Sequence, residues 1–269
     1  MIHHPLNMAR HVIRPGRRLA LIFGFPTRCA SLDYVCSAAE RKNAKVLHWS
    51  SSALDERGRP SAAIVLDVTD CSAPLEEVVE ELERSGAMNS VRAYLSPVEG
   101  FIADVASHPL LAGNNRVVIL RDSGYRELLA GLREWFGTNG TSFLYHVGFK
   151  TGSGFGRLHK DDAEKVGLKD PVQIYRNISA AMFQWAGFGI LEVEELTADG
   201  GVIVVRDSFE CELGKNSATV YSQFVRGIIA GILAELFGYG FNVVEEECIA
   251  KGDQVCRFKL KRITLRIDT

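Results

Sequence analysis

The 269-residue sequence lacks the features that most directly assign a function. Its apolar runs, such as GIIAGILAELFG, are too short and too interrupted to cross a bilayer, so we expect no contact with a membrane. A formal net charge of −2 provides no basic field for nucleic acid, which makes DNA an unexpected partner. There is no GxxxxGKS/T pattern for a P-loop nucleotide site and no CxxC pair for a dithiol redox site. No grouping of nucleophile, base and acid indicates an enzyme.

The N-terminal stretch MIHHPLNMARHVIRPGRRLALIFGF places basic residues before an apolar run, but no small-residue cleavage site follows it. We therefore do not interpret it as a signal peptide, and predict a flexible tail over residues 1–16. The six cysteines are spread too widely for a secreted disulfide framework, so most are expected to be reduced and buried. Together these observations predict a cytoplasmic location.

The first half of the chain alternates strand and helix patterns in a simple order. Apolar, β-branched runs predict strands over residues 17–25, 44–51, 61–70 and 90–98, and amphipathic runs predict helices over 29–43 and 72–86. This β-α-β-β-α-β order over residues 17–98 predicts a ferredoxin-like domain. In order and length the domain resembles ACT-type small-molecule regulatory domains, although fold analogy assigns it no ligand.

The second half is predicted to be a separate α+β domain over residues 115–269, after a connector with some helical content over 99–114. A strand is predicted at 116–123 and a two-stranded hairpin around Asp199-Gly200-Gly201. Helices are predicted over residues 124–137, 141–167, 171–189 and 219–238. The fold class predicted for the whole chain is thus α+β.

Several spaced motifs in this half resemble one family. The sequence has DSFE at 207–210, a helix containing Gly227 and Gly231, VEEEC at 244–248 and KGDQVC at 251–256. This succession resembles the 4-vinyl-reductase-type, or hydrocarbon-binding, sensory domain of phenol-responsive activators and archaeal proteins. The resemblance implies a dimeric domain that encloses a small aromatic or apolar molecule and signals its presence. The ATPase and DNA-binding helix-turn-helix of the phenol sensors have no counterpart pattern here.

Two cysteines of the last motifs raise the question of a metal. Cys248 and Cys256 flank Lys251-Gly252-Asp253, and a hairpin with that loop places them opposite each other, with Cβ atoms roughly 4.5–5.5 Å apart. The family resemblance implies zinc ligands at Glu245, Cys248 and Cys256, with a fourth at Ser222, and serine is a poor zinc ligand. Cys211 from a neighbouring strand, or a water, would then complete the site. The alternative is a structural hairpin with a free or disulfide-bonded cysteine pair.

The segment AAMFQWAGFGI supplies the apolar residues for a predicted ligand pocket. The resemblance implies that Trp185 occupies the position that grips a phenolic hydroxyl in the relatives, since its indole N–H donates one hydrogen bond. Val205 replaces a tryptophan of the relatives, which favours a ligand with fewer polar groups than phenol. The alternative is that these are ordinary core residues. The predicted pocket residues are Met182, Phe183, Trp185 and Phe188, joined by Tyr145, Phe149 and Tyr221.

Other motifs are assigned structural roles. The glycine-rich stretch 151–157 lies within or after a predicted helix, so we expect a bend over the pocket and not a phosphate loop. Gly227 and Gly231 form a GxxxG pattern that permits close helix packing, for which a dimer contact or an approach to the pocket is expected. His146 and His159 have no partner at metal spacing and are expected to be ordinary core or surface residues.

The leading hypothesis is a homodimeric sensor that binds a small apolar or aromatic molecule and signals through the dimer or through a partner protein. One alternative is a reductase, or an accessory factor, that acts on a tetrapyrrole-like hydrophobic substrate. A third is a transcription regulator, which the near-neutral charge disfavours.

Overall fold

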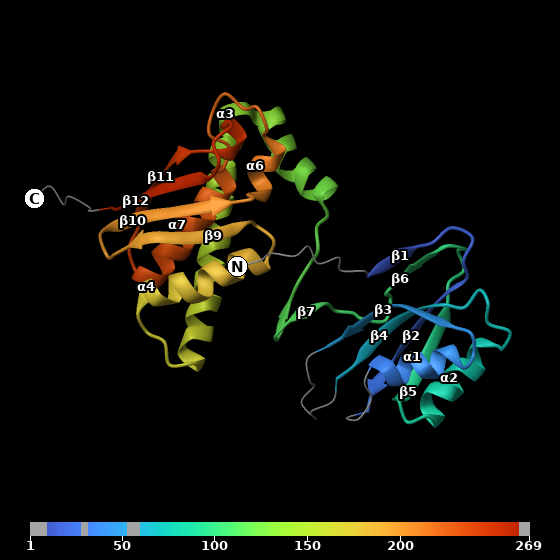
Figure 1. Ribbon diagram of the computed structural model, residues 1–269. Helices are drawn as coiled ribbons and strands as arrows, with labels where there is room; N and C mark the ends of the chain where they lie inside the picture. Colours follow the sequence, from blue (N-terminus) through green and yellow to red (C-terminus); the bar gives the residue numbers. More distant parts are fainter. Residues whose placement is uncertain (1–9, 28–31, 53–59, 264–269) are drawn as a thin grey trace, which may run out of the picture. The chain divides into compact units, whose positions relative to one another are not determined.

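A computed structural model of the chain describes residues 10–27, 32–52 and 60–263 (Figure 1). The chain forms two compact units, Met1–Ile119 and Leu120–Thr269, each with its own hydrophobic core. Within the described ranges, no helix is both long enough and apolar enough to cross a membrane.

The N-terminal unit is built on a four-stranded antiparallel sheet of order β3-β4-β2-β5. Two helices cover one face of this sheet and bury the core around Ile22, Ile64 and Leu82. Chain order and strand order together are those of the ferredoxin-like fold, which confirms the prediction; the ACT-type likeness remains a prediction. The elements are β2 (Leu19–Pro26), α1 (Leu32–Glu40), β3 (Lys45–Ser51), β4 (Ala62–Asp67), α2 (Leu75–Arg84) and β5 (Met88–Leu95). Parts of the predicted helix 29–43 and of the turn before β4 fall on 28–31 and 53–59, outside the described residues.

The second face of this sheet is covered by a two-stranded ribbon. β1 (His11–Ile13) pairs antiparallel with β6 (Phe101–Ala103), and Ile102 packs against the apolar residues of β2 and β4. The predicted flexible tail is therefore wrong for residues 11–13, because the apolar second face of the sheet needs a cover; residues 1–9 lie outside the described part. Burial on both faces also explains why β4 is a continuous apolar run, with every residue buried.

The connector differs from its prediction. Residues 99–116 contain no helix; they form β6, β7 (Leu111–Ala112) and β8 (Asn115–Arg116). The strand predicted over 116–123 is also wrong beyond Arg116, since Val118 is 80% exposed and α3 begins at Asp122. The apolar VVIL run lacks a neighbouring strand among the residues that the structure describes, so periodicity alone predicted pairing that has no partner.

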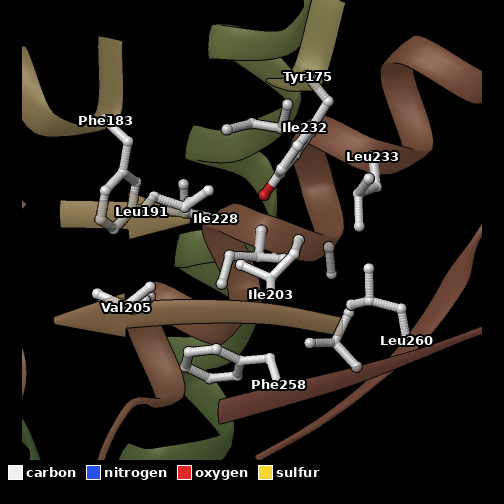
Figure 2. Close-up of a cluster of buried hydrophobic side chains, with 14 of the residues drawn as sticks. Tyr175, Phe183, Leu191, Ile203, Val205, Ile228, Ile232, Leu233, Phe258 and Leu260 are labelled. Carbon is white, nitrogen blue, oxygen red and sulfur yellow. The ribbon is translucent and has the colours of Figure 1, made fainter. Parts of the chain in front are cut away.

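The C-terminal unit packs helices against a four-stranded antiparallel sheet of order β11-β12-β10-β9 (Figure 1). Residues of β10 and β12 face the long helix α7, and Ile203, Ile228 and Phe258 are fully buried between them (Figure 2). The sheet strands are β9 (Ile190–Leu196), β10 (Gly200–Arg206), β11 (Phe241–Glu247) and β12 (Cys256–Arg262). The helices are α3 (Asp122–Lys165), α4 (Pro171–Ile174), the π-helical turn η1 (Tyr175–Ser179), α5 (Ala180–Trp185), α6 (Phe209–Leu213), α7 (Gln223–Phe237) and the 3-10 turn η2 (Ile249–Lys251). The α+β class is confirmed.

α3 consists of two helical segments that meet at Gly137. This residue has φ 53° and ψ −128°, a conformation that only glycine adopts at low cost. The two helices predicted over 124–137 and 141–167 are therefore both present, and they meet end to end with a change of direction at Gly137.

The second segment of α3 lies so close to α7 that the two backbones touch. A Cβ atom at Gly148 would overlap the carbonyl oxygen of Phe224, and one at Gly152 would overlap that of Ile228. The glycine-rich stretch 151–157 is thus a helical packing surface, which corrects the predicted bend over a pocket.

The approach is reciprocal on α7. A Cβ atom at Gly227 would overlap the carbonyl oxygen of Tyr145, and one at Gly231 that of Phe149. The GxxxG pattern therefore serves contact between two helices of the same chain, where a dimer contact or a pocket approach was expected.

This packing predicts the effect of a single methyl group. Gly231→Ala would place its Cβ 2.7 Å from the backbone nitrogen of Ser153, and backbone atoms cannot step aside cheaply. We expect a loss of about 1–3 kcal/mol in the free energy of unfolding, measured by urea denaturation. Gly131→Ala is the matched control, because no atom lies within 4 Å of the added Cβ, and it should be neutral or stabilising. Equal effects of the two variants would contradict the assigned packing.

Candidate functional site

Four buried side chains from three parts of the C-terminal unit converge on one point. Cys211 lies on the short helix α6, Glu245 on the inward face of β11, and Cys248 and Cys256 at the two ends of the final turn. One ligand atom from each of the four lies within 4.8 Å of the others. Among the described residues this is the only such group of three or more.

The β11–β12 hairpin explains why three of the four meet. Alternation along β11 buries Phe241, Val243 and Glu245 on one face, so the carboxylate is carried inward by the same period that builds the core. Glu247 pairs with Arg257 at the end of the ladder, and Cys248 and Cys256 follow one residue further on.

The turn between the two cysteines is held by specific backbone contacts. The Cys248 N–H donates to Asp253 Oδ2 over 2.8 Å, and Gly252 has φ 103°. The loop is longer than the predicted three residues, because η2 occupies its first half, yet it brings the two cysteines together as predicted.

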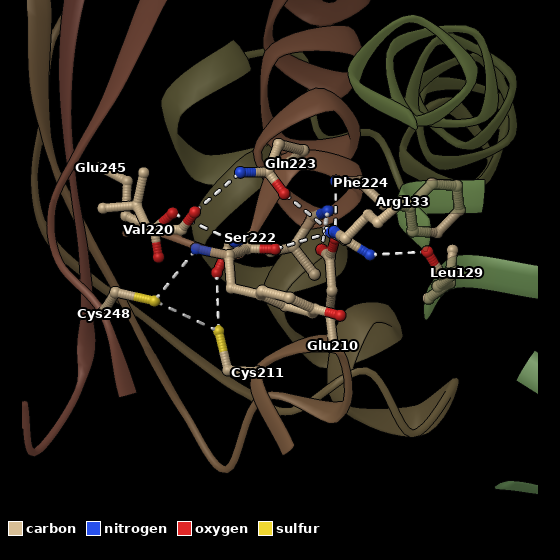
Figure 3. Close-up of polar contacts among 12 residues, drawn as sticks. Leu129, Arg133, Glu210, Cys211, Val220, Ser222, Gln223, Phe224, Glu245 and Cys248 are labelled. Atoms are coloured by element: carbon tan, nitrogen blue, oxygen red, sulfur yellow. Dashed lines mark hydrogen bonds and ion pairs between the residues drawn. The ribbon is translucent and has the colours of Figure 1, made fainter. Parts of the chain in front are cut away.

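Cys211 completes the group from a different element. Its Sγ lies 3.6 Å from Cys248 Sγ and 3.3 Å from Cys256 Sγ (Figure 3 shows Cys211 and Cys248). The sequence prediction placed Cys211 on a neighbouring strand; the structure places it on a short helix directly after β10. Ser222, the predicted family position, lies beside it, with Oγ 2.9 Å from Cys211 Sγ.

Backbone N–H groups surround the sulfurs. Tyr221 N–H donates to Cys248 Sγ over 3.3 Å, and Ile249 N–H donates to Cys256 Sγ over 3.4 Å. Ser222 N–H donates to Glu245 Oε2 over 3.2 Å. Such donors stabilise negative charge on sulfur and oxygen, as a metal thiolate site requires.

The titration of these groups is set by burial and by their mutual contacts. Burial raises the pKa of Glu245 to about 8, and the nearby Cys248 acts in the same direction. The hydrogen bond with Cys248 raises the pKa of Cys211 to about 12, while the hydrogen bond from Cys211 lowers that of Cys248. Glu245 Oε1 is buried without a hydrogen-bond partner. The group thus holds several protons and one orphaned carboxylate oxygen, which a bound cation would replace and satisfy.

The arrangement fits a divalent metal of zinc type. Sulfurs around a tetrahedral Zn²⁺ lie about 3.8 Å apart, given Zn–S bonds near 2.3 Å. The Cys211 distances of 3.3 and 3.6 Å are close to this spacing. Three sulfurs and one carboxylate oxygen form a closed four-ligand set, which is typical of a structural site. The five cysteines in the described part of the chain form no disulfide with one another.

A buried ion pair adjoins the thiol group and was not predicted from the sequence. Glu210, fully buried, pairs with Arg133 of the first α3 segment and accepts N–H bonds from Phe224 (3.0 Å) and Val225 (2.8 Å) at the start of α7 (Figure 3). Burial raises the pKa of Glu210, and Arg133 and the N–H donors oppose that rise. The glutamate of DSFE was the available signal, and it caps α7 from the residue next to Cys211.

Arg133 is satisfied on several sides. It donates to the Tyr221 carbonyl (2.8 Å), the Gln223 side chain (2.7 Å) and the Leu129 carbonyl (2.9 Å). Its guanidinium lies 3.9 Å from the centre of the Tyr221 ring. Tyr221, predicted for the pocket, therefore forms part of this polar network beside the thiol group.

Aromatic side chains form a second group on the same unit. The ring of Phe188 lies 5.4 Å from that of Phe183, 6.1 Å from Phe155 and 5.2 Å from Phe209. Phe224 continues the chain of rings at 6.3 Å from Phe209. Of these, Phe183 and Phe188 were predicted, whereas the other three were missed because they lie on separate elements.

The other predicted pocket residues lie elsewhere. Trp185 is 63% exposed, and Met182 is half-buried on the same short helix. Tyr145 and Phe149 are half-buried on α3, where they pack against the core. A ligand-binding role for any of the seven remains a prediction.

The two histidines have the ordinary roles expected of them. His159 is buried, lies 3.0 Å from Ser179 Oγ, stacks on Phe155, and has its pKa lowered by burial. His146 is exposed, with its ring beside Tyr145.

The buried ion pair yields a test by double substitution. Arg133→Met leaves the Glu210 carboxylate buried without its counter-charge, so we expect a loss of about 3–5 kcal/mol in unfolding free energy. Adding Glu210→Gln removes the uncompensated charge and should recover part of that loss, as measured by urea denaturation. A cost for Arg133→Met below about 1 kcal/mol would place the pair in the class of weak surface ion pairs and contradict its assigned role.

Comparison with known proteins assigns this region to a family. The family model of the 4-vinyl-reductase domain matches residues 202–262, a segment that contains all four converging side chains. An uncharacterised protein of Methanocaldococcus jannaschii is 33% identical over 82 residues, which are 30% of this chain and 47% of that protein. The chain thus spans about half the length of the curated relative that it matches.

Solved structures with a similar fold include a sensory domain. The phenol-responsive sensory domain of the transcription activator PoxR, solved with phenol, matches with a TM-score of 0.51 and 18% identity, covering 73% of this chain and 94% of that chain. A vinyl-4-reductase family protein of Methanocaldococcus jannaschii has a TM-score of 0.38 and 23% identity, covering 56% of this chain and 86% of that chain. The likeness to PoxR shows a shared α+β fold. The chain carries a 4-vinyl-reductase domain at residues 202–262.

Proposed function

We propose that the C-terminal unit binds a small apolar or aromatic molecule and acts as a sensor. The observation that carries this proposal is the group of aromatic rings around Phe188, which supplies ring faces and edges for an aromatic ligand. The 4-vinyl-reductase domain match and the fold shared with the phenol-responsive domain of PoxR support it.

A zinc ion bound by Cys211, Glu245, Cys248 and Cys256 is the second part of the proposal. When bound, the ion supplies a structural cross-link between α6 and the β11–β12 hairpin, and it gives the buried Glu245 Oε1 a partner. The residues themselves exclude water, and the backbone of Tyr221, Ser222 and Ile249 holds the ligand atoms in place.

Signalling is proposed to run through a homodimer or a partner protein. Exposed aromatic residues on α3 support a protein contact: Trp135 is 80% exposed, Phe136 57% and Phe143 55%. Ligand occupancy would then bias the unit between two arrangements that differ in their affinity for the partner.

Native mass spectrometry of gently purified protein, followed by denaturing mass spectrometry, tests the proposal as a whole. A dimer that carries a small organic mass and one zinc per chain, both lost on denaturation, would support it. A protein that neither carries nor takes up any apolar molecule from a screen would contradict the sensor function, and a zinc-free protein that does not take up added zinc would contradict the metal.

The zinc ligand set predicts an exchange of positions. Cys211→Ser should lower bound zinc from about one per chain toward none, because three ligands remain of the usual four. The double variant Cys211→Ser/Ser222→Cys should regain zinc, since Ser222 Oγ lies 2.9 Å from Cys211 Sγ. Metal content is measured by plasma mass spectrometry after dialysis.

Cys36→Ser is the matched control for that series, because Cys36 is a half-buried cysteine of the N-terminal unit, and it should keep its zinc. Full zinc in Cys211→Ser would remove Cys211 from the ligand set.

The aromatic group predicts which residue holds the organic ligand. Phe188→Ala should lower affinity for the co-purifying or screened molecule by roughly tenfold, because a ring contact is worth about 0.5–1.5 kcal/mol beyond its buried area. Trp185→Ala, on the neighbouring exposed position, is the comparison and should change it little. Isothermal titration calorimetry measures both; a larger effect at Trp185 would favour the binding role that the sequence predicts for that residue.

A further inference from the structure

Tyr175 carries a hydroxyl in the middle of the C-terminal core. The side chain is fully buried, and its oxygen has no hydrogen-bond partner. Figure 2 shows the hydroxyl directed toward Ile228 and Ile203, in the space between η1, α7 and β10. Burial raises the pKa of this phenol, so the group is neutral and able to donate.

Such a hydroxyl is costly unless something pairs with it. An unsatisfied buried polar group destabilises a fold by about 1–3 kcal/mol, and phenylalanine would fill the same space without that cost. Within the described ranges, only Tyr175 and Ser208 have their single side-chain polar atom buried and unpaired. A serine hydroxyl is small, whereas the Tyr175 ring delivers its oxygen deep into an apolar core.

A water molecule does not resolve the mismatch. Buried waters typically make two to four hydrogen bonds, and the labelled neighbours of this hydroxyl are aliphatic (Figure 2). A partner that brings its own apolar body and offers one polar atom suits the surroundings better.

The backbone that carries Tyr175 is unusual. Tyr175–Ser179 form a π-helical turn between α4 and α5, and such turns are rare and are found mostly at functional sites. The other polar side chain buried on this turn, Ser179, is satisfied by His159. The turn therefore presents one paired and one unpaired hydroxyl to the interior.

A cleft of about 340 Å³ reaches this turn from the surface. Its apolar wall includes Leu168 and Leu236, together with Ile174, the residue before Tyr175. Lys160, Glu164 and Lys169 complete the lining. The cleft provides a route by which a small molecule reaches the core beside the π-helical turn.

We propose that the Tyr175 hydroxyl is the polar anchor of the ligand site, and that the ligand is an apolar molecule with one neutral oxygen, a hydroxyl or a carbonyl. A carboxylate is excluded because its charge would be buried among aliphatic side chains without a cation. This inference rests on the proposed ligand-binding function and narrows its ligand class.

The test uses matched probes that differ by one hydroxyl: 1-naphthol with naphthalene, and phenol with benzene. Affinities for the full chain, freed of co-purifying small molecules, are measured by calorimetry for wild type and Tyr175→Phe. We expect wild type to favour the hydroxylated member of a pair, and Tyr175→Phe to lose roughly tenfold of that preference, the usual magnitude for one buried hydrogen bond. Tyr145→Phe, at a half-buried position that lies on α3, is the matched control and should keep the preference.

The outcomes separate the anchor from the function. If both members of a pair bind and the preference is the same in Tyr175→Phe, the anchor is wrong while ligand binding stands. If wild type binds none of the four probes, the proposed aromatic-ligand function is overturned, and the anchor with it. An independent readout is stability, since ligand-free Tyr175→Phe should have a melting temperature equal to or above that of wild type. A clear decrease would show that the hydroxyl already has a partner within the fold and would overturn the proposal.

Discussion

The C-terminal unit depends on the contact between the backbones of α3 and α7. Glycines on both helices remove the side chains that would hold them apart, so that carbonyl oxygens of one helix lie where Cβ atoms of the other would be. Two apolar helices at this distance form a rigid pair, and one face of the sheet packs on α7. Because the pair is rigid, the start of α7 is placed accurately relative to α6 and the last hairpin.

That placement explains the chemistry of the site. The first N–H groups of α7 lack partners within the helix, and the Glu210 carboxylate accepts two of them from the end of DSFE. Arg133 balances the charge, so a helix terminus, an acid and a base form one buried network. The residue after Glu210 is Cys211, and the residue before α7 is Ser222, so the same network positions the edge of the thiol group.

The sequence predicted the elements whose signals are local. Alternation and turn residues were sufficient for the ferredoxin-like order, the Asp199-Gly200 hairpin and the facing pair Cys248 and Cys256. It could not predict contacts that join distant elements. Cys211 was considered as a ligand, but its helix was interpreted as strand, because DSFECEL continues the apolar pattern of β10 for only a few residues. Tyr175 had no distinguishing signal, since a π-helical turn reads as ordinary helix. The VVIL run was predicted as a strand because periodicity does not report whether a partner strand exists.

The proximity of Cys211 and Ser222 bears on how metal centres are recognised across a protein family. The two side chains come from different elements, eleven positions apart in the chain, yet their terminal atoms occupy neighbouring points in space. A ligand can therefore move from one element to the other during evolution while the position of the ion is kept. An aligned column that reads serine in place of cysteine would then suggest a lost centre in a protein that retains it. Families of this kind are better surveyed by the volume that side chains can reach than by the spacing of letters in a motif.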